Sequence, residues 1–141
     1  MFGQGDLKNL VNQSPSGLSS ALDHIPMSGD VSEAQYEQFA TRFREAFDDK
    51  PHKGGVATAS RLLAMKHPDW FVAVNNANRN TLCAALGIAP TTLTLDNYWP
   101  SIVVPITLST WWNHPRPASR MDARIWDHRA ALLDSLFYKP I

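Results

Sequence analysis

Disulfides, membrane spans and a secretory leader are not expected from this sequence, and each expected absence argues against a class of protein. The single cysteine, Cys83, cannot form an internal disulfide and is typical of a reducing compartment. The longest nearly apolar run, WPSIVVPITL (99–108), is too short to span a bilayer and contains two prolines. No basic segment leads into an apolar run near the start, so no secretory signal is expected. These absences predict a soluble, cytoplasmic protein that has no contact with a membrane.

The sequence also has no surplus of positive or negative charge, and this balance limits the kinds of partner that it can bind through net charge. The 13 Lys and Arg residues equal the 13 Asp and Glu residues. A protein that coats duplex DNA needs a surplus of basic side chains for the phosphates. The balance therefore argues against such a protein and against an acidic mimic of nucleic acid, but it is compatible with a local basic patch.

The motifs that define metal and nucleophilic sites are absent as well. No histidine or cysteine pair has the spacing of a zinc ligand set. There is no G-x-S-x-G element and no Walker motif, and Cys83 has no local charge to activate its thiol. We therefore predict no metal, no cofactor and no catalytic residue. The five histidines are scattered: His24, His52, His67, His114 and His128.

Helical patterns dominate what is present, whereas hairpin turns and period-two alternation are nearly absent. The clearest helix carries a capping box, with Ser32 as N-cap and Gln35 three residues later. Its aromatic residues recur at three- and four-residue steps, which is typical of a face turned to the core. Asn75 or Asn76 is expected to cap a later helix that stops at Gly87. The expected helices are 6–11, 14–25, 32–47, 56–66, 76–86 and 119–138.

Two further segments are ambiguous. DWFVAV (69–74) is short, apolar and β-prone, so it predicts a brief strand or a buried extended piece. The apolar spacing of 94–113 permits a helix, but Pro100 should start one and Pro105 should kink it. The chain of 141 residues is long enough for one core. We predict a mostly α, compact, single-domain bundle of about six or seven helices, with 1–13 as a loosely packed N-terminal segment.

The helix expected at 119–138, capped by Ser119, places charge in an apolar surface. On a helical wheel, Arg129 and Asp122 fall between two apolar arcs. A buried arginine is costly unless carboxylate or carbonyl oxygens meet it. We expect an ion pair with an acid from another helix, and the alternative is a guanidinium held for an anionic ligand. The arcs are Met121, Ile125, Leu132, Leu136 and Trp126, Leu133, Phe137; the polar side carries Arg120, Arg124, Asp127 and Asp134, with His128 at its border.

The stretch HKGGVATAS (52–60) is a candidate anion site. Gly54 and Gly55 precede a helix, so backbone N–H groups at its start would point at a bound anion, with Lys53 and Thr58 assisting. In the alternative interpretation, the glycines only allow the chain to enter the helix tightly.

The stretch WWNHPRP (111–117) is a candidate stacking site. Aromatic and arginine side chains together are typical of surfaces that bind single-stranded nucleic acid. Neighbours on a helix are about 100° apart, however, so Trp111 and Trp112 cannot form one flat platform. We expect the pair to act chiefly as a core anchor, with at most one exposed tryptophan.

One long stretch resembles a known group of proteins. It consists of ATASRLLAMKHPDWFVAVNNANRNTL (57–82), YW (98–99), WW (111–112) and IWDHRAALLDSLFY (125–138). It resembles helical segments of bacterial and phage restriction or defence-associated proteins, and it is similar to helical domains of DNA-glycosylase type and to regions that accompany restriction GTPase subunits. The positions that carry the pattern are Lys66, Pro68, Phe71, Asn76 and Asn78. No helix-hairpin-helix, GTPase or nuclease motif is present, so the resemblance implies no catalytic role.

Together these patterns favour a non-catalytic helical binding module that acts in phage–host conflict. It would be a restriction or defence component, or a phage-encoded inhibitor of a defence complex, and it would contact a protein or nucleoprotein and, by a local basic patch, nucleic acid. The predicted binding residues are Lys53, Trp112, Arg116, Arg120 and Arg124. The alternative is an enzyme acting on nucleic acid, with a DNA-glycosylase-like or nuclease-associated helical domain. Its candidate residues are Asp122, Asp127 and His128.

Overall fold

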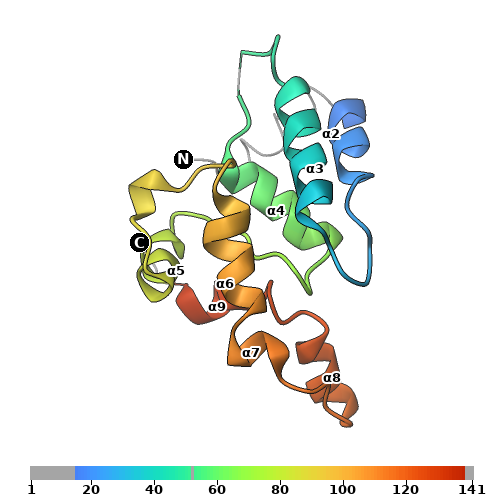
Figure 1. Cartoon of the computed structure of the whole chain (residues 1–141), viewed down its shortest axis with the longest axis vertical. Helices are drawn as coiled ribbons and strands as arrows, with labels where there is room; N and C mark the ends of the chain where they lie inside the picture. The colour runs from blue at the N-terminus through green and yellow to red at the C-terminus, as the bar shows by residue number, and fades with distance from the viewer. Residues whose placement is uncertain (1–14, 52, 139–141) are drawn as a thin grey trace.

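The computed structural model describes residues 15–51 and 53–138, and within these ranges the chain is mostly helical and has no strand (Figure 1). The expected mostly α fold is confirmed. The predicted helix at 6–11 and the segment 1–13 lie outside the described residues. The helices are α2 (Pro15–Leu22), α3 (Glu33–Glu45), α4 (Val56–Lys66), α5 (Arg79–Leu86), α6 (Val104–Thr107), α7 (Thr110–Asn113), α8 (Arg120–Trp126) and α9 (Leu133–Phe137).

The capping box and the aromatic stripe of α3 are confirmed. The Ser32 Oγ accepts a hydrogen bond from the backbone N–H of Gln35 at 3.1 Å, and the Gln35 side chain accepts one from the backbone N–H of Ser32 at 2.8 Å. The stripe packs into a single core, with α2 beside α3 (Figure 1). The stripe therefore holds the fold together and leaves no aromatic surface on α3 for a ligand. Its buried members are Tyr36, Phe39, Phe43 and Phe47.

Gly54 has a packing role at the entry to α4. A Cβ atom at this position would lie 2.6 Å from Cε1 of Phe43 and 2.8 Å from Cε2 of Phe47. No side chain fits in that space, so the first glycine of the predicted anion site is required by the rings of the core.

The segment 71–75 is buried without forming a strand, and side chains take the place of a neighbouring strand. The Tyr98 hydroxyl donates to the carbonyl of Val72 at 2.7 Å and accepts from its N–H at 3.2 Å. Ser60 Oγ accepts from the N–H of Val74 at 2.9 Å, and Asn78 Nδ2 donates to the carbonyl of Ala73 at 2.7 Å. Buried backbone groups must be paired, and here two side chains from distant segments, Tyr98 and Ser60, and one from the next turn, Asn78, pair them.

The ambiguous segment 94–113 is helical through both of its prolines and breaks only after α6. A π-helical turn occupies Trp99–Val103, with Pro100 in its first positions, and α6 and α7 follow. Pro105 has no N–H for the helical ladder. The N–H of Val104, just before it, bonds to the carbonyl of Trp99, five residues back, as in a π-helix. Pro100 therefore starts a helical segment as expected. That segment continues through Pro105, which lies in the first positions of α6, and the break comes at Leu108 and Ser109, before α7.

The prediction of one continuous helix over 119–138 is wrong. Ser119 caps α8 as expected, but the helix ends at Trp126 and α9 begins only at Leu133. Between them, the N–H of Ala131 donates to the carbonyl of Pro68 at 2.9 Å instead of to its own helix. A hydrogen bond to a distant segment thus replaces the bond that would continue the helix. Asp122, predicted to lie in the apolar surface, is exposed.

The start of α5 also differs from the prediction. Asn78 is its N-cap, not Asn75 or Asn76. The Asn75 side chain accepts hydrogen bonds from the N–H groups of Ala77 and Asn78 at 2.9 and 3.0 Å, which makes a turn before the helix. The predicted stop is confirmed, because Gly87 has φ 75° in the left-handed region that ends helices.

Candidate functional site

Arg129 is buried in an ion pair, as the helical wheel predicts. Its guanidinium contacts the carboxylate of Asp69, and the two side chains are 6% and 23% exposed. The partner lies in the turn after α4, not on a helix. Burial raises the pKa of the Asp69 carboxyl, and the charge of Arg129 opposes that shift. The structural ion pair therefore replaces the alternative of a guanidinium held for a ligand.

Three tryptophans surround this pair and fix the direction of α7 and α8. The Arg129 guanidinium lies 4.0 Å from the ring centre of Trp112 and 3.7 Å from that of Trp126. The indole N–H of Trp111 donates to the carbonyl of Arg129 at 2.7 Å, and that of Trp112 to the carbonyl of Asp69 at 2.6 Å. Only Trp111 is exposed, at 41%, while Trp112 packs against the core. Trp111 and Trp112 therefore anchor α7 to the rest of the fold, and one of the two is exposed, as expected.

Apolar side chains that the wheel turns inward face solvent on α8. Met121 is 74% exposed and Ile125 is 46% exposed. Ile125 joins two shallow hollows. One, of about 470 Å³, includes Trp111, and the other, of about 380 Å³, includes Met121 and Leu132. We call this the α8 surface: Trp111, Met121, Ile125 and Leu132, with Arg124 and His128 at its edge. In Figure 1, α8 lies at the end of the molecule opposite α2 and α3.

The predicted basic residues of this region differ in how far they are engaged. Arg116 is paired with Asp127 by two hydrogen bonds of 3.1 Å, and this pairing lowers the pKa of the Asp127 carboxyl. Arg120 and Arg124 are exposed on α8, and neither has an acidic partner within the described ranges. The side chain of Trp112 is turned to the core, so Trp111 takes the exposed position expected of its neighbour.

Lys53 lies away from the α8 surface. Its ammonium donates to the carbonyls of Phe47, at 2.7 Å, and Asp48. These carbonyls follow the end of α3, where a cation is favourable for the helix dipole. The structure therefore gives the lysine a capping role beside Gly54, separate from the other predicted binding residues.

The candidate residues of the enzyme alternative are not brought together. Asp122 lines the hollow beside Trp111, His128 lines the neighbouring one, and Asp127 is engaged by Arg116. Among residues 15–51 and 53–138, no group of three or more His, Cys, Asp or Glu side chains is arranged to hold a metal ion.

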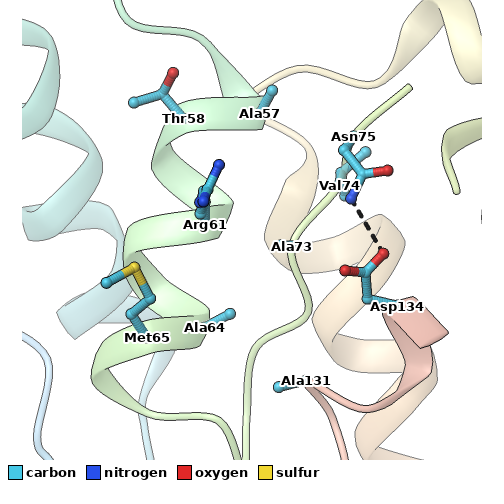
Figure 2. A pocket seen from close by; sticks show the side chains of 10 residues that line it. All are labelled: Ala57, Thr58, Arg61, Ala64, Met65, Ala73, Val74, Asn75, Ala131 and Asp134. Carbon is cyan, nitrogen blue, oxygen red and sulfur yellow. Dashed lines mark hydrogen bonds between the residues drawn. The ribbon is translucent and has the colours of Figure 1, made fainter. Parts of the chain in front are cut away.

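A second concave site lies between α4 and α9 and was not predicted. This α4–α9 pocket has a volume of about 440 Å³. Figure 2 shows Arg61 on α4 and Asp134 on the opposite wall, beside the segment 73–75. Wheel analysis places Asp134 on a polar helix side, and nothing local relates it to Arg61. Only the break before α9 and the course of 71–75 bring these walls together.

The comparisons with known proteins add no family. No protein-family model, no curated protein and no solved structure matches the chain. The resemblance to restriction and defence-associated proteins therefore stays a prediction. In the part of the chain that the structure describes, every helix is too short or too polar to cross a membrane.

Proposed function

We propose that this chain is a non-catalytic helical binding module, and that the α8 surface docks an acidic amphipathic segment of a protein partner. The observation that carries the proposal is the exposure of Met121, Ile125 and Trp111 side by side at one end of the molecule. Contiguous exposed apolar side chains in a monomer are typical of interaction sites.

The composition of the α8 surface fits a protein interface. Aromatic residues, methionine and arginine are enriched where proteins bind one another. Trp111 is held by its hydrogen bond to the carbonyl of Arg129, so little side-chain entropy is lost when a partner covers its exposed edge. The hollow between Trp111 and Ile125 gives a partner side chain a place to insert.

The charge at the edge of the surface favours an acidic partner. Arg124 at the edge and Arg120 beside it on α8 have no acidic partner in the described ranges. Asp127 is neutralised by Arg116, and Asp122 in the hollow offsets one of these two positive charges, so the balance stays positive. Complementary charges at a rim raise association rates and fix orientation. An amphipathic helix with Asp or Glu beside its apolar residues meets both requirements.

The setting in phage–host conflict belongs to the same proposal and is supported by the sequence resemblance alone. In that setting the partner is a subunit of a restriction or defence complex, and the module is either a component of the complex or a phage-encoded inhibitor of it.

A peptide-display selection against the full chain tests the proposal. The Ile125→Asp variant serves as counter-target. Met27→Asp serves as control because Met27 is also an exposed apolar side chain, 76% against 46% for Ile125, and lies between α2 and α3. We expect enriched peptides with apolar residues three and four apart and with Asp or Glu between them. They should bind the wild type and Met27→Asp alike, lose at least tenfold affinity for Ile125→Asp, and bind more weakly as salt rises.

Four results would contradict the proposal. The selection could give no peptide that distinguishes the wild type from Ile125→Asp, or it could enrich basic peptides. Sedimentation could show a dimer that Ile125→Asp dissociates, so that a second copy occupies the surface. A short oligonucleotide could bind in place of peptides and lose affinity in an Arg120→Glu, Arg124→Glu variant, which would assign the surface to nucleic acid.

A further inference from the structure

We infer that the α4–α9 pocket binds a small zwitterion such as a free amino acid, with the anionic group of the ligand on Arg61 and its ammonium group on Asp134. The two charged side chains lie on opposite walls of one pocket (Figure 2) and do not form an ion pair with each other. The pocket volume of about 440 Å³ is in the range of small-molecule sites.

The carboxylate of Asp134 is held in place before any ligand arrives. Its Oδ1 accepts hydrogen bonds from Asn75 Nδ2 at 3.1 Å and from the buried Asn78 Nδ2 at 2.6 Å. Its Oδ2 has no hydrogen-bond donor within the described residues, and in Figure 2 the oxygen that lacks a dashed line is turned to the α4 side. Because this carboxylate is already fixed and has one oxygen available, it loses little side-chain entropy when it binds a donor group.

Arg61 is the uncommitted cation of the pocket. It is half-buried on α4 and forms no ion pair within the described ranges. The arginines that line the neighbouring hollow are used by the fold. Arg44 pairs with Asp96, and Arg79 donates to the carbonyls of Pro90 and Leu93 at 2.8 Å each. Only the guanidinium of Arg61 is left for the paired hydrogen bonds that a carboxylate accepts.

The two charges together select the class of ligand. A simple anion would bind Arg61 but be repelled by Asp134, and a simple cation would meet the reverse. A molecule with both charges satisfies both walls. Apart from Thr58 and Asn75, the remaining wall is made of small or apolar side chains, which leave room for the ligand's own side chain: Ala57, Ala64, Met65, Ala73, Val74 and Ala131.

NMR titration of the full chain with the standard set of free L-amino acids tests this inference, and calorimetry then measures the best ligand. We expect at least one amino acid to shift the signals of Arg61, Val74 and Asn75 in a saturable way. Its N-acetyl and amide derivatives, which each lack one charge, should bind at least tenfold more weakly. Guanosine, whose base offers donors to a carboxylate and acceptors to an arginine, is the competing probe.

Charge-neutral variants and matched controls complete the test. Asp134→Asn keeps an oxygen for Asn75 and Asn78 while it removes the charge, and Arg61→Gln removes the cation. Both should lower affinity at least tenfold, whereas Asp122→Asn and Arg120→Gln on α8 should not change it. The inference would be overturned if the wild type shows no saturable shift with any amino acid at concentrations up to about 10 mM, the weak end of specific binding. Binding of guanosine alone, or equal binding of the charged and acetylated ligands, would also overturn it.

Discussion

Arg129 forms a buried ion pair with Asp69, and this pair joins the segment between α8 and α9 to the turn that follows α4. The bond from the N–H of Ala131 to the carbonyl of Pro68 lies beside it. The C-terminal part of the chain is thus attached to the turn by one charged and one backbone contact. The direction in which the α8 surface points depends on both.

Removing the arginine alone should destabilise the fold. In Arg129→Met, the partly buried carboxylate of Asp69 loses its counter-charge, and the indole rings of Trp112 and Trp126 lose the guanidinium between them. We expect the free energy of unfolding in urea to fall by about 3 kcal/mol, the lower end for a buried pair, because Asp69 is partly exposed.

The double variant Arg129→Met, Asp69→Leu is the control for this pair. It removes both charges, so most of the loss should be recovered. A cost near zero for Arg129→Met alone would show that the pair contributes nothing to stability.

Tyr98→Phe should destabilise the protein without changing its shape. The variant leaves both backbone groups of Val72 without a partner in a position with no exposed surface. Each buried group left unpaired costs about 1–3 kcal/mol. Denaturation in urea measures the loss, and hydrogen exchange at the Val72 amide should become faster. Tyr138→Phe changes an exposed ring, 57% accessible, and should leave both measurements unchanged. An unchanged Val72 amide in Tyr98→Phe would contradict the assignment.

Gly54→Ala should be destabilising for reasons of space. The added methyl group would overlap the rings of Phe43 and Phe47, and overpacking of this kind costs about 1–3 kcal/mol. If the clash is the cause, Phe43→Leu should offset part of the loss, so that the double variant is more stable than the sum of the two single effects predicts.

Gly87→Ala is the control for Gly54→Ala. Its Cβ meets nothing within 4 Å, and only its positive φ is unfavourable. Additive effects of Gly54→Ala and Phe43→Leu would rule out the clash.

The pKa of Asp127 should depend on Arg116. The hydrogen bonds from the guanidinium lower that pKa, so the pair stabilises the fold above the ordinary pKa of the carboxyl, and this contribution is lost as the pH falls through the lowered value. In Arg116→Gln the pKa of Asp127 should rise toward that of a free aspartate. An NMR titration of the Asp127 carboxyl carbon measures the change. Arg120→Gln should leave it unaltered, and the same titration curve in all three proteins would refute the coupling.

Local patterns in the sequence predict most of the fold. The capping box of Ser32 and Gln35, the stop at Gly87 and the cap at Ser119 all occur in the structure. Each depends on residues within one helical turn, so no long-range information is needed. The aromatic stripe of α3 is equally local, since a helical period fixes which residues share a face.

Contacts between distant residues explain the errors. The helix over 119–138 ends early because Ala131 bonds to Pro68, and no periodicity within 119–138 contains that information. The burial of Arg129 is predicted correctly, but its partner is not, because Asp69 lies in a turn that the sequence does not place. The exposure of Met121 and Ile125 follows from the same break.

The candidate site is predictable only in part. The sequence directs attention to the stretch 111–124, and Trp111, Met121 and the two unpaired arginines of α8 do lie there, whereas Ile125 lies one residue beyond it. The indole N–H groups of Trp111 and Trp112 donate to carbonyls of other segments, and these hydrogen bonds determine which of the two rings is exposed. The α4–α9 pocket has no local signature, because Arg61 and Asp134 come together only in the folded chain.

The hydroxyl that pairs the backbone of Val72 has a consequence for synthesis on the ribosome. Val72 emerges before Tyr98, so for that interval its N–H and carbonyl depend on water or on a chaperone. The backbone at Val72 therefore cannot complete its pairing as the chain grows until the tyrosine has left the exit tunnel.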